Sequence, residues 1–314
     1  MRSVLVIYYS QSGEVAQIAR TFASQFQSPG TTIAFEALRP IADYPFPWRS
    51  IRRFFDVMPE CILRQPQQIQ PPEFDPLSRF DLVVLAYPVW FLTPAPTMQG
   101  FFNSPHVAVL RGTEVITICV SRAMWQQASE WMKRLLARAG ALHCDNIVAM
   151  HQGSSVLTLI STPRALLFGK RDALLKVFPR AGVSEADQTR IRELGSTAAR
   201  RLDERRMVGA SLLTGEPALA VKRWSIVPEL LAWYCFHAWA VTIQQLGKWH
   251  PELRRLGVYA FAVFLVAAIF VGLPVVLLAT LLLYPVIKQH LNVYSHRLAA
   301  PTGEQRNAAT KASE

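Results

Sequence analysis

The chain has 314 residues and carries 33 Lys and Arg against 22 Asp and Glu, a net charge of +11. This length suits one large domain or two smaller ones. Positive charge is common in nucleic-acid-binding proteins, but no nucleic-acid-binding motif is present, so we expect no such partner. The basic residues gather at 164–180, 190–206, 222–223 and 248–255. Attraction to an anionic membrane surface, worth roughly 1 kcal/mol per Lys or Arg, explains the charge at least as well.

The four cysteines are scattered, with no C-x-x-C pair and no metal-ligand spacing: Cys61, Cys119, Cys144 and Cys235. The chain opens on an apolar strand pattern instead of a signal peptide. The sequence therefore predicts reduced thiols, a cytoplasmic location for the N-terminal domain, and no metal site.

The first twenty residues predict an anion site. Residues 4–9 are continuously apolar, as in a strand buried on both faces of a parallel sheet. A helical pattern starts at Val15. A short polar loop separates the two: Ser10, Gln11, Ser12 and Gly13. Such a loop directs free backbone N–H groups and the positive end of a helix dipole at a bound anion.

No Lys or Arg lies between Val4 and Ala19, so hydrogen bonds and the dipole would hold the anion. The P-loop and G-x-G-x-x-G patterns are both absent. The loop resembles the phosphate-binding loop of the flavodoxin-like family, which binds the terminal phosphate of FMN. The resemblance implies that backbone amides of six consecutive residues hold phosphate: Ser10, Gln11, Ser12, Gly13, Glu14 and Val15. Val15 departs from the family, which usually has Thr or Ser there. A serine-capped helix in an unrelated α/β protein is the alternative.

Strand and helix patterns alternate through residues 1–206 and predict a doubly wound parallel α/β sheet. Five strands are expected, at 4–9, 31–37, 80–86, 114–120 and 143–150. This inventory fits a flavodoxin-like sheet of order 2-1-3-4-5, whose ligand lies at the carboxyl ends of strands 1 and 3.

Other segments of residues 1–206 form helices or interrupt the pattern. A short helix is expected to end at about residue 103, and further helices are expected at 125–139 and 185–206. Residues 38–78 form an aromatic-rich insertion, expected to cover a pocket. Residues 151–183 form an irregular basic segment.

Two further loops are expected at the carboxyl ends of the strands, where the ligand would lie. Residues 87–97 follow the third strand and resemble the Pro-aromatic loop of FMN and quinone reductases. This resemblance implies that Pro88, Val89, Trp90 and Phe91 flank the flavin ring; a Pro-rich structural turn is the alternative. After the fourth strand, Ser121 and Trp125 match the third FMN-facing loop by position only, and Trp125 is equally suited to a helix core.

The C-terminal third is apolar. Residues 256–287 contain 32 positions without a charged side chain, more than the roughly 20 needed to cross a bilayer. We favour one kinked transmembrane span; a break at Gly272-Leu273-Pro274 would instead give a re-entrant hairpin. Within the linker region 207–255, residues 224–246 predict an interfacial aromatic helix, because the basic residues at 248–255 favour the cytoplasmic side. Residues 288–314 form a polar tail.

More narrowly, the chain resembles the bacterial dialkylresorcinol condensing enzyme family. The resemblance depends on its length, the YYSQSG and YPVWFLTPAPT stretches and the apolar tail. It implies an FMN-dependent oxidoreductase at the inner (cytoplasmic) membrane that aromatises a cyclic diketone. The alternatives are an NAD(P)H-dependent quinone or FMN reductase and a non-enzymatic electron carrier or scaffold. The expected partners are membrane lipids and a lipophilic small molecule. Homo-oligomerisation is left open, and the sequence assigns no catalytic residue.

Overall fold

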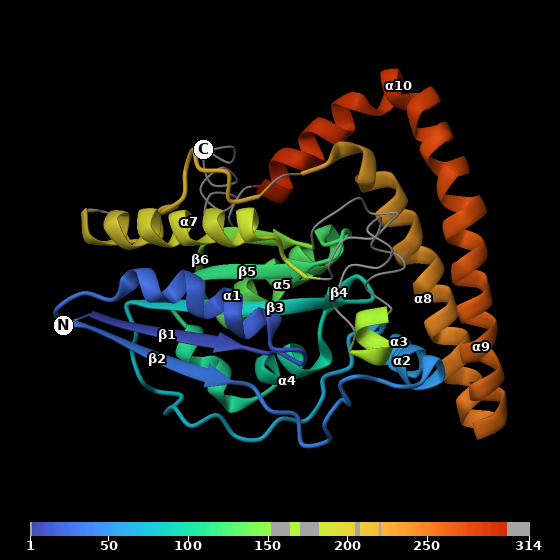
Figure 1. Ribbon diagram of the computed structural model, residues 1–314, viewed down its shortest axis with the longest axis horizontal. Coiled ribbons are helices and arrows are strands. Elements are labelled where there is room, and N and C mark those ends of the chain that lie inside the picture. Colours follow the sequence, from blue (N-terminus) through green and yellow to red (C-terminus); the bar gives the residue numbers. More distant parts are fainter. Residues whose placement is uncertain (1, 152–163, 170–181, 205–207, 220, 300–314) are drawn as a thin grey trace.

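The computed structural model describes residues 2–151, 164–169, 182–204, 208–219 and 221–299. Within these residues a parallel sheet is built from five strands: β1 (Arg2–Tyr8), β2 (Thr31–Ala37), β3 (Leu82–Trp90), β5 (Glu114–Ser121) and β6 (Leu142–Met150). Their spatial order is β2-β1-β3-β5-β6, which confirms the predicted order of a flavodoxin-like doubly wound sheet. A two-residue strand, β4 (Thr93–Pro94), pairs antiparallel with the end of β3. All five parallel strands end on the same side of the sheet, on the right in Figure 1.

Helices cover both faces of this sheet. Helices α1 (Glu14–Ala23) and α7 (Glu185–Glu204) pack on one face, and α4 (Pro96–Phe102) and α5 (Gln126–Ala139) on the other. Alternate residues of β1 serve the two layers, since Val4 and Val6 join one core cluster while Leu5 and Ile7 join the other. Short 3₁₀ turns follow α1 (η1, Ser24–Phe26) and α4 (η2, Pro105–Leu110).

The third strand is longer than the sequence predicted. Residues 87–90, expected in a loop, continue β3, and Pro88 stands opposite Val120 of β5. The main-chain oxygen of Pro88 accepts a hydrogen bond from Ala95 N (3.2 Å). The strand therefore carries Trp90 to the edge of the sheet on regular backbone. The helix expected at 125–139 is confirmed, and the one expected at 185–206 is confirmed as far as the described residues reach, at Glu204. Most of the 151–183 segment lies outside the described residues.

The linker after α7 packs against the domain instead of separating from it. Asp145 of β6 accepts hydrogen bonds from Leu212 N (2.7 Å) and Leu213 N (3.2 Å). Both leucines are buried in the core layer that α1 and α7 form. For the residues described on either side of it, the packing is therefore continuous across the predicted boundary at residue 206.

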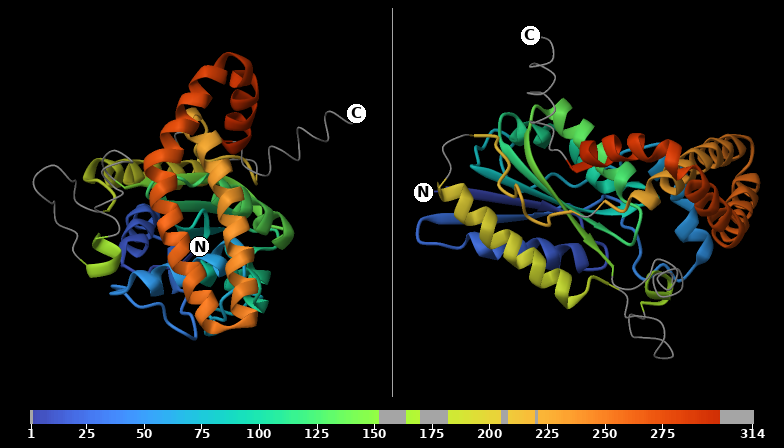
Figure 2. Two further views of the ribbon diagram at one scale, coloured as in Figure 1. Left: turned by 90° about the vertical axis from the view of Figure 1, so that its right-hand side faces the viewer. Right: turned by 90° about the horizontal axis from the view of Figure 1, so that it is seen from above.

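The C-terminal helices form a layer beside the carboxyl ends of the strands (Figures 1 and 2). After a 3₁₀ turn (η3, Arg223–Ser225), α8 (Ile226–Trp249) runs along the domain and α9 (Pro251–Ala267) returns beside it. Helix α9 continues through a π-helical turn, η4 (Ala268–Gly272), into α10 (Leu273–Ala299). The break considered at residues 272–274 is thus a π-helical irregularity in a continuous helix. Farther along, α10 turns back toward the sheet, and Pro285 lies inside it.

The insertion at 38–78 packs against these helices. It forms two short helices, α2 (Ile51–Asp56) and α3 (Met58–Ile62). Met58 and Ile62 join a core cluster with Ala240 of α8 and Phe261 of α9. The insertion therefore connects the sheet to the C-terminal layer, a role that the sequence did not indicate.

A buried histidine in β6 gives the fold a predictable pH dependence. His143 Nε2 lies 3.1 Å from the hydroxyl of Thr117. Burial, reinforced by the nearby Lys133 ammonium, lowers the pKa of His143 from its usual 6.5 to about 3. The folded protein holds the ring neutral, while the unfolded chain takes up a proton near its ordinary pKa. The contribution to stability is therefore complete above that pKa and is lost as the pH falls toward the folded value.

We expect His143→Gln to flatten this acid-side loss. Between about pH 7.5 and about pH 5.5, the wild type should lose about 1 kcal/mol of unfolding free energy through His143, and the variant should not. Glutamine keeps a group able to hydrogen-bond Thr117. Urea unfolding of both proteins at the two pH values measures the difference, and equal losses would contradict the assignment.

Candidate functional site

The loop between β1 and α1 has the backbone geometry of an anion site. Gly13 is the N-cap of α1 with φ 86°, a left-handed conformation that favours glycine. The Ser10 hydroxyl accepts a hydrogen bond from Ala16 N (3.1 Å), which fixes the loop to the first turn of the helix. The side-chain amide of Gln11 donates a hydrogen bond to the main-chain oxygen of Pro45 (2.9 Å) and so joins the loop to the 38–78 insertion.

Two predicted phosphate residues have side chains directed elsewhere. Val15 is 4% exposed and lies in the core, so only its backbone faces the loop. Its departure from the family pattern therefore removes a side-chain donor but leaves the amide. The Glu14 carboxylate accepts a hydrogen bond from Val183 N (2.7 Å) and lies 3.0 Å from His151 Nε2. This carboxylate thus contacts the segments at the end of β6 and the start of α7.

The predicted second loop is a tight hairpin with unusual backbone. Trp90 and Thr93 pair across a turn whose central residues, Phe91 and Leu92, have φ 45° and 65°. Two positive φ values define the twist that two-residue hairpins prefer, but without glycine each costs about 1–2 kcal/mol. Packing supports this geometry, since the Thr93 hydroxyl donates to the main-chain oxygen of Cys61 (3.0 Å) and Phe91 packs against Phe54 (ring centroids 5.3 Å).

Trp90 lies among aromatic rings from two other segments, the end of β1 and the 38–78 insertion. Its ring centroid is 4.9 Å from that of Tyr44, 5.8 Å from that of Tyr9 and 6.0 Å from that of Trp48, all edge to face. Trp48 is 3% exposed. The structure thus brings Trp90 to the end of β1, beside the Ser10–Gly13 loop. Sequence reasoning did not assign Tyr9, Tyr44 or Trp48 to the site, although the aromatic content of the insertion was a signal for the last two.

Burial also fixes the charge state of two of these rings. Burial raises the pKa of both Tyr9 and Tyr44 well above the ordinary value of a phenol. Both phenols therefore stay neutral near pH 7 and are poor general bases. The Tyr44 hydroxyl donates to Gln67 Oε1 (3.3 Å), a contact within the insertion.

A series of contacts between aromatic rings leads from the Trp90 cluster to the C-terminal helices. Trp48 contacts Phe54 (5.9 Å between ring centroids), and Phe54 contacts Phe55 (5.0 Å). Phe55 in turn contacts Phe261 of α9 (5.7 Å). An unbroken series of aromatic contacts therefore connects the edge of the sheet to the apolar layer of α8 and α9.

The third predicted loop turns inward. Trp125 is 2% exposed and belongs to the core under α5, which matches the alternative considered for it. The Ser121 hydroxyl donates to the main-chain oxygen of Met124 (3.0 Å). At the start of α5, the buried Glu229 carboxylate of α8 accepts a hydrogen bond from Gln127 N (2.7 Å). The Glu229 side chain thus binds the N-terminus of α5, and the Trp125 ring packs in the core under the same helix.

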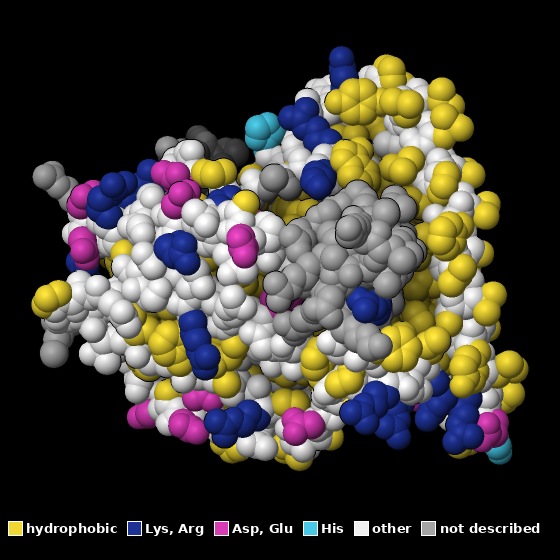
Figure 3. Space-filling view, in the orientation of Figure 1, with side chains coloured by type: hydrophobic (Ala, Val, Ile, Leu, Met, Phe, Trp, Pro, Cys, Tyr) yellow, Lys and Arg dark blue, Asp and Glu magenta, His cyan; other side chains and the backbone are white. Residues whose placement is uncertain are grey.

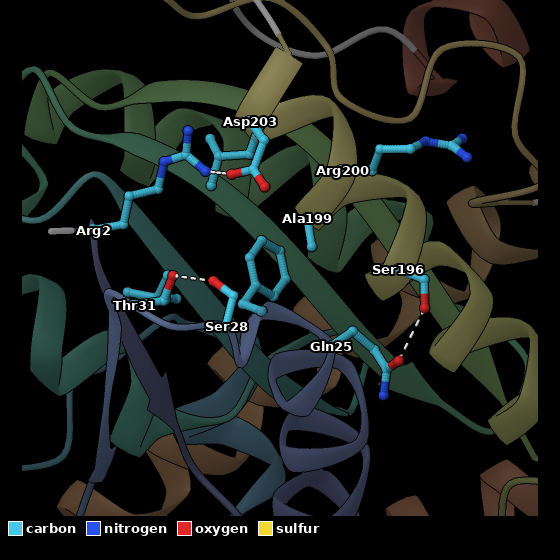
Figure 4. Close-up of a pocket in the computed structure, with 11 residues that line it drawn as sticks. Arg2, Gln25, Ser28, Thr31, Ser196, Ala199, Arg200 and Asp203 are labelled. Atoms are coloured by element: carbon cyan, nitrogen blue, oxygen red, sulfur yellow. Dashed lines mark hydrogen bonds and ion pairs between the residues drawn. The ribbon is translucent and has the colours of Figure 1, made fainter.

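A cavity of about 230 Å³ lies at the opposite end of the strands, near the start of β1. Figure 4 shows the residues that line it. Six of its polar side chains form three pairs: Arg2 with Asp203, Ser28 with Thr31 (2.8 Å) and Ser196 with Gln25 (2.9 Å). The Arg200 side chain points away from them (Figure 4). Ligands of open α/β sheets bind at the carboxyl ends of the strands, which is the other edge. Among the described residues no group of three His, Cys, Asp or Glu side chains could hold a metal ion.

No family model matches the sequence, and no curated protein matches it. Solved structures do match. A putative flavoprotein from Bacteroides eggerthii is 17% identical over 47% of this chain and 88% of its own, with a TM-score of 0.38. A flavodoxin from the domain Archaea is 11% identical over 64% and 99%, with a TM-score of 0.36. An azoreductase from Bacillus anthracis is 9% identical over 62% and 99%, with a TM-score of 0.34. The chain's own strand order is what makes the fold flavodoxin-like.

Proposed function

We propose that this protein is a membrane-associated, FMN-dependent oxidoreductase that acts on a lipophilic ring substrate. One juxtaposition carries the proposal. The Ser10–Gly13 loop, the Trp90 aromatic cluster (Tyr9, Tyr44, Trp48 and Trp90) and the apolar C-terminal helices all lie at the carboxyl edge of the sheet. In a doubly wound sheet this edge is where a ligand binds.

The residues at the loop fit the phosphate end of FMN. No atom lies within 4 Å of where a Cβ on Gly13 would stand, so the loop has open space beside it. Main-chain N–H groups at the start of a helix can donate to a phosphate, and the helix dipole stabilises its negative charge. Residues from Ser10 to Val15 would then hold the phosphate, mainly through main-chain N–H groups.

The Trp90 aromatic cluster fits the flat ring of a flavin, because planar aromatic surfaces stack or pack edge to face at centroid distances of about 4.5–7 Å. When bound, FMN supplies two-electron redox chemistry. The protein's own contribution is to orient the ring and exclude water, which the buried Trp48 and the hairpin at Phe91 would do. Tyr9 and Tyr44 keep their protons, so they act as hydrogen-bond donors or packing partners.

The apolar layer beside the site supports a lipophilic substrate. Converting a cyclohexane-1,3-dione ring into a resorcinol removes two hydrogen atoms, that is, two electrons and two protons. FMN would take up these electrons, and a second acceptor must then reoxidise it. The solved structures described above are a putative flavoprotein, a flavodoxin and an azoreductase, so this narrower reaction depends on the sequence resemblance alone. The alternative is a reductase, in which NAD(P)H supplies a hydride and a quinone takes up two electrons and two protons.

An absorbance spectrum of the purified, detergent-solubilised protein tests the proposal. We expect the visible bands of oxidised flavin, either as purified or after titration with FMN. Anaerobic mixing then separates the reactions. Bleaching by a cyclic diketone would support the aromatising oxidase, whereas bleaching by NAD(P)H followed by recovery with a quinone would support the reductase. Protein that neither contains flavin nor binds added FMN would contradict both and support a membrane scaffold without a cofactor.

A further inference from the structure

We propose that the helix Pro251–Ala299 attaches the protein to one leaflet of a membrane and does not cross the bilayer. Both of its ends then lie on the side of the flavodoxin-like domain. This inference depends on the proposed membrane association, but it concerns the topology of the attachment, which the sequence left open between a span and a re-entrant segment.

The outer surface of this helix is apolar over most of its length. The most apolar 18-residue stretch of the helix has a mean hydropathy of 2.9, and only 6% of that stretch is buried in the structure. In Figure 3, hydrophobic side chains cover the edge that α9 and α10 form. Large exposed side chains include Val263, Phe270, Val275, Leu281, Leu282 and Val286. An exposed apolar surface of this extent marks an interaction with a membrane or a partner.

The first end of the helix is fixed to the domain by ion pairs. Arg254 Nε lies 2.8 Å from Asp56 Oδ1, and its guanidinium also donates to Glu60 (2.8 Å). The guanidinium donates as well to the main-chain oxygen of Asp56 (2.7 Å). Both carboxylates belong to the insertion that packs beside the Trp90 aromatic cluster. The start of α9 is therefore held at the ligand edge of the sheet.

The other end of the helix is fixed to the same domain. Lys133 of α5 donates hydrogen bonds to the main-chain oxygens of Arg297 and Leu298 (both 2.9 Å). The Arg297 side chain lies 3.3 Å from Glu130, also on α5. The Tyr294 hydroxyl accepts a hydrogen bond from the Gln127 amide (3.3 Å). These contacts satisfy carbonyl groups that a helix C-terminus leaves without intrahelical partners.

These two attachments argue against a span. The helix has 49 residues, so its contour is about 73 Å, more than twice the roughly 30 Å apolar core of a bilayer. If it crossed the membrane, its ends would stand on opposite sides, and one set of these ion pairs and hydrogen bonds would have to break. The turn in α10 brings the chain back to α5, as Figures 1 and 2 show. The apolar face between the two attachments can enter one leaflet while both ends stay bound.

The charges beside the apolar surface match an anionic lipid surface. Lys and Arg side chains gather where the hydrophobic edge ends, over α2 and the start of α9 (Figure 3). They include Arg53 and Lys248, both exposed. Each such residue near an anionic leaflet contributes about 1 kcal/mol. Trp249, which is 77% exposed, follows Lys248 at the end of α8, and tryptophan is common at membrane interfaces.

Cysteine labelling of the full-length protein tests this topology. The background is Cys235→Ser, since the other three cysteines are buried. Single cysteines replace exposed residues at the two ends (Lys248→Cys and His296→Cys), at the middle of the apolar face (Val275→Cys) and, as a domain marker, at Gln27 (Gln27→Cys). A membrane-impermeant thiol reagent is applied to intact bacterial host cells and to inverted membrane vesicles.

We expect positions 27, 248 and 296 to label together in inverted vesicles and not in intact cells. Position 275 should label in neither until detergent is added. Labelling of positions 248 and 296 from opposite sides would show a span and overturn the proposal. Recovery of the protein from the soluble fraction, with the apolar face covered by a second copy, would also overturn it. A flavin spectrum from the same membranes separates the two proposals, because loss of flavin with this labelling pattern contradicts only the FMN assignment.

Discussion

Gly13→Val is expected to weaken FMN binding by at least about a hundredfold while leaving the sheet folded. Gly13 has φ 86°, and a β-branched residue is strained in that conformation by about 1–2 kcal/mol or more. Relaxing this strain rotates the backbone, so the amides at the start of α1 would no longer converge on the phosphate. A hundredfold loss corresponds to about 2.8 kcal/mol of binding free energy. Fluorescence titration with FMN measures it.

Gly30→Val is the matched control. Gly30 also has a positive φ (93°), and no atom lies within 4 Å of where a Cβ on it would stand. It lies in the turn before β2, at the other edge of the sheet. The two variants should lose similar stability, and only Gly13→Val should lose FMN. Wild-type affinity in Gly13→Val would show that the loop does not hold the phosphate. Equal loss of FMN in both would point to a general effect on folding.

Phe261→Ala is expected to lower the unfolding free energy by about 3–5 kcal/mol. Phe261 is fully buried in α9 and contacts Phe55, Phe236 and Trp239. Removing its ring leaves a cavity between the insertion and the hairpin of α8 and α9. The docking of that hairpin should weaken most. Denaturant unfolding in detergent measures stability, and limited proteolysis at the α8–α9 connection reports local detachment.

Phe270→Ala provides the comparison on the same continuous helix. Phe270 is 69% exposed, so its truncation removes few contacts within the protein. The unfolding free energy of the Phe270→Ala protein in detergent should stay within about 0.5 kcal/mol of the wild-type value. If the two alanine variants lost equal stability, the helix would not be docked as the structure has it.

The sheet could be predicted from sequence because its signals are local. Continuous apolar runs identify the central strands, and their alternation with helices leaves few topologies. The Ser10–Gly13 loop could also be predicted, since a polar break between an apolar run and a helical pattern marks a turn. The side chain of Val15 could also be assigned to the core, because its spacing to Ile18 and Phe22 is helical.

The surroundings of Trp90 could not be predicted, because they depend on contacts between distant segments. Nothing near Trp48 in the sequence indicates that its ring packs against Trp90, 42 positions later in the chain. The turn at Phe91 and Leu92 also contradicts local preference, since neither residue favours positive φ. Tertiary packing holds this turn, and such packing leaves no periodic pattern in the sequence.

The ion pair between Arg254 and Asp56 has a consequence for biosynthesis. Its partners are 198 residues apart, so the ribosome makes the insertion about 10–40 s before it makes α9. During that interval Met58 and Ile62 lack the helices that bury them in the finished protein. The nascent chain therefore carries an uncovered apolar surface until the last helices emerge, and such a surface is prone to aggregation during that interval.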